Sequence, residues 1–142
     1  MTFRVDVVAG LVSILESFKA ANPTLLLRVF TTTPPNFNTD LPCAFVGPRN
    51  ERATHDQQIR TRQMVPTIVF VDHITDNEET MGRMDRLVDA FADYLTDRPH
   101  VVAGTVWDRW QIIDDQIKVG DGSLLQSATF TLNDLSISEG RV

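Results

Sequence analysis

Cysteine is nearly absent from the sequence, since Cys43 is the only one among 142 residues. A lone cysteine excludes an intrachain disulfide and leaves the redox compartment undetermined, although folding in the cytosol fits best. Zinc sites need clustered Cys and His ligands, whereas Cys43 and the three histidines are scattered along the chain. We therefore expect neither a metal site nor a cofactor.

Long apolar runs and an excess of basic residues are lacking as well. No stretch of about 18 apolar residues occurs, so the sequence predicts no membrane-spanning segment. The 13 basic residues are outnumbered by 19 acidic ones, which gives a formal net charge of −6. Because phosphate contacts require Lys and Arg, this balance disfavours sequence-specific DNA binding.

The closely spaced glycines that a phosphate-binding loop requires at a strand-to-helix turn are also missing. Gly120 and Gly122 precede an expected strand rather than a helix. What remains is an ordinary composition, with 42% hydrophobic and 23% charged residues. One packed core is feasible at this length, and the sequence predicts a single domain over residues 1–142.

Hydrophobic periodicity predicts the elements of the first half. Apolar residues at helical spacing predict a helix over 3–21, whose thin polar face indicates cover on more than one side. Strand-like composition marks three further segments: 25–32, 43–46 and 60–72. The last of these is apolar on both faces, and Pro66 within it indicates an edge position or a bulge. The polar, patternless residues 48–58 are expected to form a mobile loop.

The second half begins with a strongly amphipathic helix. Asp76 and Glu79 form a capping-box pattern at its start, and the sequence Asp97-Arg98-Pro99 ends it. Strands are then expected over 101–106, 110–119 and 123–137. The predicted fold is therefore α+β, an antiparallel or mixed β-sheet of about four to five strands with two α-helices packed on it.

Candidate catalytic residues are few. Asp72 and His73 end the apolar strand, with Asp76 close behind, and a histidine in that place can act as a base or ligand. The simpler interpretation is a polar turn leading into the second helix, because no nucleophile is tied to these residues by spacing. Cys43 is a possible nucleophile for His73, but cysteine is more often a buried core residue. We expect no catalytic residues.

Several surface patterns point instead to contacts between proteins. One stretch of this acidic chain is locally basic, with Arg49, Arg52, Arg60 and Arg62. Aspartates spaced four residues apart line the second helix: Asp85, Asp89 and Asp93. Such charges are either solvated or pair between copies of the chain. The tryptophans Trp107 and Trp110 are interpreted as core residues, as subunit-interface residues or as a ligand-binding pair. The threonine face of the last strand, with Thr129 and Thr131, faces either solvent or a neighbouring subunit.

The order of these elements resembles the tail-terminator proteins of long-tailed, siphovirus-like bacteriophages. The resemblance rests on a first helix, an early strand, a polar loop, and the block Met64 to Asp72 feeding an acidic helix. The turn Gly120-Asp121-Gly122-Ser123 before a threonine-rich strand is similar too, so the likeness covers nearly the whole chain. No catalytic signature belongs to this family.

The resemblance implies a structural protein of the virion's tail-neck region, assembled in the host cytoplasm. Such a protein forms a homo-oligomeric ring, hexameric in this family, that caps the tail tube and ends polymerisation of the major tail tube protein. It also docks onto head-completion (stopper) proteins, and DNA passes through its lumen without lasting attachment. Alternatives are a stopper or tail-tube protein of the same virion, or a small enzyme or ligand-binding domain centred on Asp72 and His73.

Overall fold

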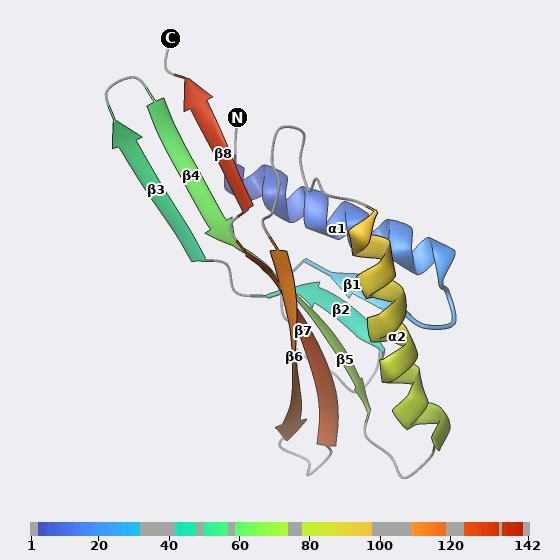
Figure 1. Ribbon diagram of the computed structural model, residues 1–142. Coiled ribbons are helices and arrows are strands. Elements are labelled where there is room, and N and C mark those ends of the chain that lie inside the picture. Colours follow the sequence, from blue (N-terminus) through green and yellow to red (C-terminus); the bar gives the residue numbers. More distant parts are fainter. Residues whose placement is uncertain are drawn as a thin grey trace.

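The computed structural model describes residues 3–31, 42–47, 50–56, 59–73, 78–97, 109–118, 124–133 and 135–140. Within these ranges the chain forms two helices and eight strands (Figure 1). In chain order these are α1 (Phe3–Ala21), β1 (Arg28–Phe30), β2 (Cys43–Val46), β3 (Asn50–Asp56), β4 (Ile59–Val65), β5 (Thr67–His73), α2 (Glu78–Thr96), β6 (Arg109–Lys118), β7 (Leu124–Asn133) and β8 (Leu135–Gly140).

The main sheet has five strands in the order β1-β2-β5-β7-β6. Strands β1 and β2 are parallel and every other neighbouring pair is antiparallel, so the sheet is mixed. Helix α1 lies against β1 and β2, and α2 lies against β7. The predicted class, an α+β fold with two helices on a mixed sheet, is confirmed. We call this part the body.

Four phenylalanines form the centre of the body's core. Phe18 of α1 and Phe91 of α2 are fully buried together with Phe70 of β5 and Phe130 of β7. Phe91 lies edge-on to the other three, with ring centroids 5.1 Å from Phe18, 4.9 Å from Phe70 and 5.0 Å from Phe130. Edge-to-face pairs of this kind add about 0.5–1.5 kcal/mol each beyond the buried area. The cluster thus holds both helices on one face of the sheet.

The predicted long strand over 60–72 is wrong in one respect, because it is two strands in two different sheets. Strand β4 ends at Val65, β5 begins at Thr67, and Pro66 lies between them. Proline has no N–H for a ladder hydrogen bond, so a sheet boundary suits it. Its carbonyl accepts a hydrogen bond from the Leu132 N–H at 3.0 Å. The predicted strand over 123–137 divides in the same way, into β7 and β8.

Strands β3, β4 and β8 form a second, three-stranded sheet that the sequence did not predict. We call it the arm, and Figure 1 shows it extending away from the body. The predicted mobile loop over 48–58 is wrong for its described residues, because β3 pairs with β4 from Asn50↔Val65 to Asp56↔Ile59. Ala53 is the only apolar residue in β3, so no hydrophobic pattern marked it as a strand.

The remaining predictions are largely confirmed. The first helix spans Phe3–Ala21 and the strand over 43–46 is β2. Strand β1 is shorter than the predicted 25–32, because the N–H groups of Leu25 and Leu26 turn back to the Asn22 carbonyl. The second helix is α2, and the strand over 110–119 is β6. The predicted cap at Asp76 and the strand over 101–106 lie outside the described residues.

Candidate functional site

Asp72, the first catalytic candidate, fastens α2 to the sheet. Its side chain is fully buried at the end of β5. Arg83 of α2 donates two hydrogen bonds to it, from Nε at 2.7 Å and from Nη2 at 2.8 Å, and the His73 N–H donates a third at 2.9 Å. Gln126 of β7 donates to the His73 carbonyl at 3.2 Å. A carboxylate held by a bidentate arginine has a structural explanation, which favours the simpler interpretation of Asp72 and His73.

Cys43 lies in a small apolar cluster on the sheet face away from the helices. Its neighbours there are Phe45, Val69, Val71 and Leu125, all buried. The cysteine itself is 1% exposed. This is the setting of a core cysteine rather than of a reactive one. Within the described ranges, no three His, Cys, Asp or Glu side chains lie close enough together to hold a metal ion.

The basic stretch contributes one residue to an ion cluster within the chain. Arg62 of β4 donates from Nε to Glu51 of β3 at 2.5 Å, and Arg4 of α1 contacts the other carboxylate oxygen. The Glu51 side chain is only 5% exposed. The hydrogen bond from Arg62 lowers the pKa of Glu51, burial opposes this, and Arg4 adds to the lowering. The cluster fastens the arm to the first turn of α1.

The other charged candidates occupy three places. Asp85, Asp89 and Asp93 are exposed along α2, as predicted. Arg52 and Arg60 lie on β3 and β4, in the hairpin of the arm rather than in a loop. Arg49 lies outside the described residues. The structure therefore keeps the acidic line on the surface, and it gives Arg62 a partner in its own chain.

Trp110 and the two threonines lie on opposite faces of the sheet. Trp110 of β6 is half-buried on the helix side, with its ring 5.6 Å from that of Phe130. Thr129 and Thr131 of β7 are half-buried on the face without helices. Trp107 lies outside the described residues. Trp110 is therefore in part a core residue, as one of its interpretations expected, while the threonines lie on a face that neither helix covers.

Sequence reasoning missed Ile113 on that helix-free face. Pairing across β2, β5, β7 and β6 puts Phe45, Val69, Thr129 and Ile113 in one row. Phe45 and Val69 are 5% and 8% exposed, whereas Ile113 at the sheet edge is 56% exposed. Two adjacent isoleucines on a strand must point to opposite faces, so Ile112-Ile113 was the available signal. We call Gln111, Ile113, Thr129 and Thr131 the β6–β7 face.

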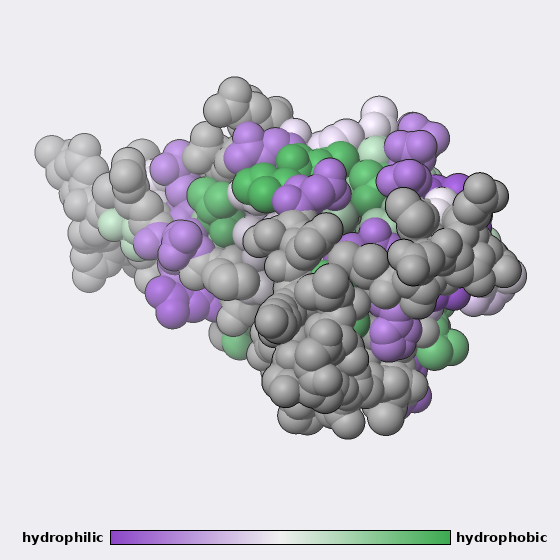
Figure 2. Space-filling view, turned by 90° about the horizontal axis from the view of Figure 1, so that it is seen from below, coloured by the Kyte–Doolittle hydropathy of each residue, from purple (hydrophilic) through white to green (hydrophobic). Residues whose placement is uncertain are grey.

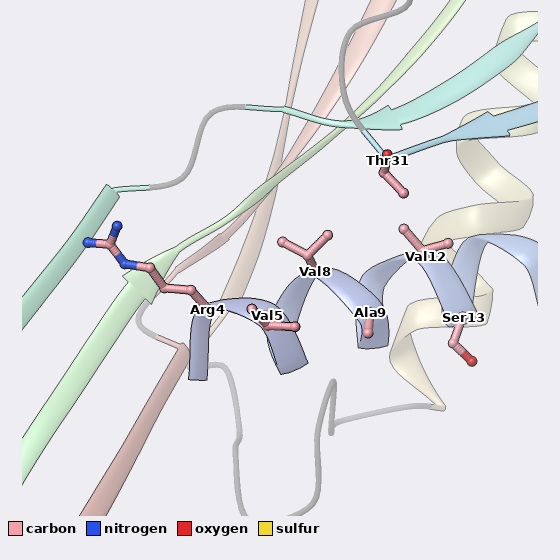
Figure 3. A pocket seen from close by; sticks show the side chains of 7 residues that line it. All are labelled: Arg4, Val5, Val8, Ala9, Val12, Ser13 and Thr31. Carbon is pink, nitrogen blue, oxygen red and sulfur yellow. The ribbon is translucent and has the colours of Figure 1, made fainter. Parts of the chain in front are cut away.

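A second apolar surface lies on the outer side of α1. It is a groove of about 610 Å³ that runs along the helix to the end of β1, lined by Arg4, Val5, Val8, Ala9, Val12, Ser13 and Thr31. Val8 and Val12 point toward the side where Thr31 lies, and Arg4 extends toward the arm (Figure 3). Val5 is 67% exposed. We call this surface the α1 groove, and it agrees with the thin polar face of this helix.

Hydrophobic surface is gathered rather than scattered on the view of Figure 2, where a band of apolar residues lies among hydrophilic ones. Single exposed apolar residues are normal on a soluble protein, but grouped ones mark contact sites. Neither described helix has the length and apolar run that crossing a bilayer requires. Grouped exposed apolar residues of this kind are typical of a surface that contacts another macromolecule.

Comparison with known proteins gives distant likenesses among solved structures. No family model matches the chain, and no curated protein matches it. Among solved structures the chain is similar to a chain of the "Virion of native gene transfer agent (GTA) particle", at 11% sequence identity with a TM-score of 0.47. The likeness covers 84% of each of the two chains. At this identity and TM-score it assigns the chain to no family.

Proposed function

We propose that the protein is a structural component of a phage virion and acts by assembling with other proteins. The order of its elements supports this proposal, because the likeness to tail terminators depended on that order. Helix α1, strand β1, the block that contains β5, helix α2 and the β6–β7 hairpin follow one another in the order on which that likeness rests, while part of its polar loop is strand β3. The contacts that hold Asp72 and Cys43 favour structural roles for both residues.

The specific role that we propose is that of a tail terminator. Copies of the chain form a ring, hexameric as in the family that the sequence resembles, which caps the tail tube and ends polymerisation of the tube protein. The opposite side of the ring joins the tail to head-completion proteins. This role places the protein in the tail-neck region of the virion, after assembly in the host cytoplasm.

One observation carries the proposal. The exposed apolar residues of the described chain include Val5 on the outer side of α1 and Ile113 at the edge strand β6. These lie on two separate surfaces at opposite ends of the same sheet. A chain that must bind a neighbour on each side requires two such surfaces, whereas an enzyme requires convergent polar groups in one pocket.

The acidic balance of the chain fits the passage of DNA. Asp85, Asp89 and Asp93 form an exposed line on α2, and the formal net charge is −6. A channel wall that carries carboxylates repels phosphates and allows DNA to pass without lasting attachment. The alternative for this line is contact with the arginines of a neighbouring copy, and both uses are compatible with a ring.

A tube-elongation assay tests the specific role. The tail tube protein of the same virion is polymerised with increasing amounts of this protein, and tube lengths are measured by electron microscopy. A terminator shortens the tubes and appears as one ring at a tube end. Tubes that lengthen and incorporate the protein along their walls would identify a tube protein instead. Tubes of unchanged length with no bound ring would contradict the terminator role.

A further inference from the structure

The arm joins the body through a bend that is built into two strands. Pro66 separates β4 from β5, and a single residue separates β7 from β8. The ladder ends in the arm at Met64↔Leu135 and resumes in the body at Thr67↔Thr131, so two residues on one strand oppose three on the other. An extra residue of this kind is a β-bulge, which bends the strand that carries it. The junction between arm and body is therefore a local break in the sheet.

The arm beyond this junction has little packing of its own. Met64 at its root is buried in the core of the body, whereas Thr61, Arg62 and Gln63 farther along β4 are only half-buried. Ala53 on the paired strand β3 is exposed. A small sheet depends on packing against a helix or another apolar surface for its stability. The orientation of the arm therefore depends on contacts that cross the junction.

One such contact is the ion pair between Arg4 of α1 and Glu51 of β3. Helix α1 packs on β1 and β2 of the body, so Arg4 reaches across the junction to the arm (Figure 3). The two carboxylate oxygens of Glu51 have different partners. Oε2 contacts Arg4, whereas Oε1 accepts a hydrogen bond from Arg62 within the arm. The Arg4 side chain is 70% exposed and the Glu51 side chain is 5% exposed.

This arrangement allows the contact with Arg4 to open at little cost. Removing the partner of a buried carboxylate is strongly destabilising, but Glu51 keeps Arg62 when Arg4 leaves. Arg4 itself turns to water, and an ion pair with so exposed a partner contributes little to stability. The contact thus joins two parts of the chain and can open without leaving a buried charge unpaired.

We propose that the arm is a hinged element that pivots at Pro66, and that Arg4 is the latch that holds it against the first turn of α1. Met64 stays in the core and fixes the pivot while the arm moves. A swing of about 20° displaces Thr61, which lies five residues from Pro66 at about 3.3 Å per residue, by roughly 6 Å. The inference goes beyond the proposed function and does not depend on ring assembly.

Distance measurements between two spin labels test the hinge. Thr61→Cys in the arm and Ala20→Cys at the exposed end of α1 carry the labels, while Cys43 is 1% exposed and stays unlabelled. Labelled chains are diluted with an excess of unlabelled chains, so that each distance is measured within one chain. We expect a narrow distribution of the label distance, and a distribution that is wider by about 6 Å after Arg4→Met. Arg4→Lys, which keeps a cation, narrows the distribution again.

Two controls separate a released arm from a damaged fold. Arg86→Met removes an exposed arginine of α2 that has no part in the latch, and it leaves the distribution narrow. A second label pair within the body, Ala20→Cys with Asp93→Cys, stays narrow in Arg4→Met. Equal widths for the wild-type latch and Arg4→Met would overturn the inference, whether both are narrow or both are broad. Broadening of the body pair would overturn it as well, because the variant would then loosen the whole fold.

Discussion

Replacing Arg83 by methionine tests the contact that fastens α2 to the sheet. The substitution keeps the unbranched stem and a good helix former but removes the guanidinium, which leaves the fully buried Asp72 carboxylate with the His73 N–H. Removing one partner of a buried ion pair costs about 3–5 kcal/mol. Because the Arg83 side chain is itself 30% exposed, we expect the lower end, about 3 kcal/mol.

Urea unfolding followed by tryptophan fluorescence measures this loss. With a slope of about 2 kcal/mol per molar urea, the midpoint falls by roughly 1.5 M. Arg86→Met is the matched control, because Arg86 is exposed on the same helix, and its effect stays within about 0.5 kcal/mol. In Asp72→Val/Arg83→Met the buried charge is gone and the His73 N–H loses its acceptor, so the loss is smaller, about 1–2 kcal/mol. Equal midpoints for Arg83→Met and Arg86→Met would refute the reasoning.

Three further predictions concern the same fold. The pKa of Glu51 is lowered in the folded chain, so its contribution to stability is present above the ordinary glutamate pKa and is lost as the pH falls through the lowered value. The difference in urea midpoint between wild type and Glu51→Gln therefore shrinks as the pH is lowered from about 7 to about 3. A difference that stays constant would contradict this. Gly47→Ala lowers the free energy of unfolding by about 1–3 kcal/mol, since a Cβ there lies 2.4 Å from Thr67 Oγ1 and 3.0 Å from Val69 Cγ2. This loss is smaller in a Thr67→Ala background, where the hydroxyl is absent. Phe91→Ala lowers the free energy of unfolding by about 3–5 kcal/mol in the same assay, because its ring lies edge-on to Phe18, Phe70 and Phe130. A loss below about 1 kcal/mol, which is typical of a surface substitution, would reject the described core.

The helices were predictable because the buried side of an amphipathic helix consists of apolar residues that recur at a fixed spacing in the sequence. Leu11, Leu15 and Phe18 of α1 are all fully buried, as that spacing requires. The strand that contains Ile68 and Phe70 was predictable for the same reason, since it is apolar on both faces and buried on both. Local pattern therefore identified the elements that form the core.

The arm and the ion contacts were not predictable, because they depend on pairings that a local pattern does not contain. Strand β3 has one apolar residue and gains its structure from the ladder with β4. Arg62 was interpreted as either a solvated charge or a contact for another copy, yet it pairs with Glu51, eleven positions away. Asp72 likewise finds Arg83 eleven positions along the chain, across the connection from β5 to α2. Such partners become visible only when the strands and helices are placed in space.

The mass of the wild-type particle tests the central claim, assembly of identical copies, most directly. Native mass spectrometry and light scattering are run over a range of protein concentrations, with and without tail tube ends. We predict a species near six times the 16.0 kDa mass of one chain, either free in solution or bound to tube ends. A chain that stays monomeric at every concentration and also fails to gather at tube ends would contradict the account.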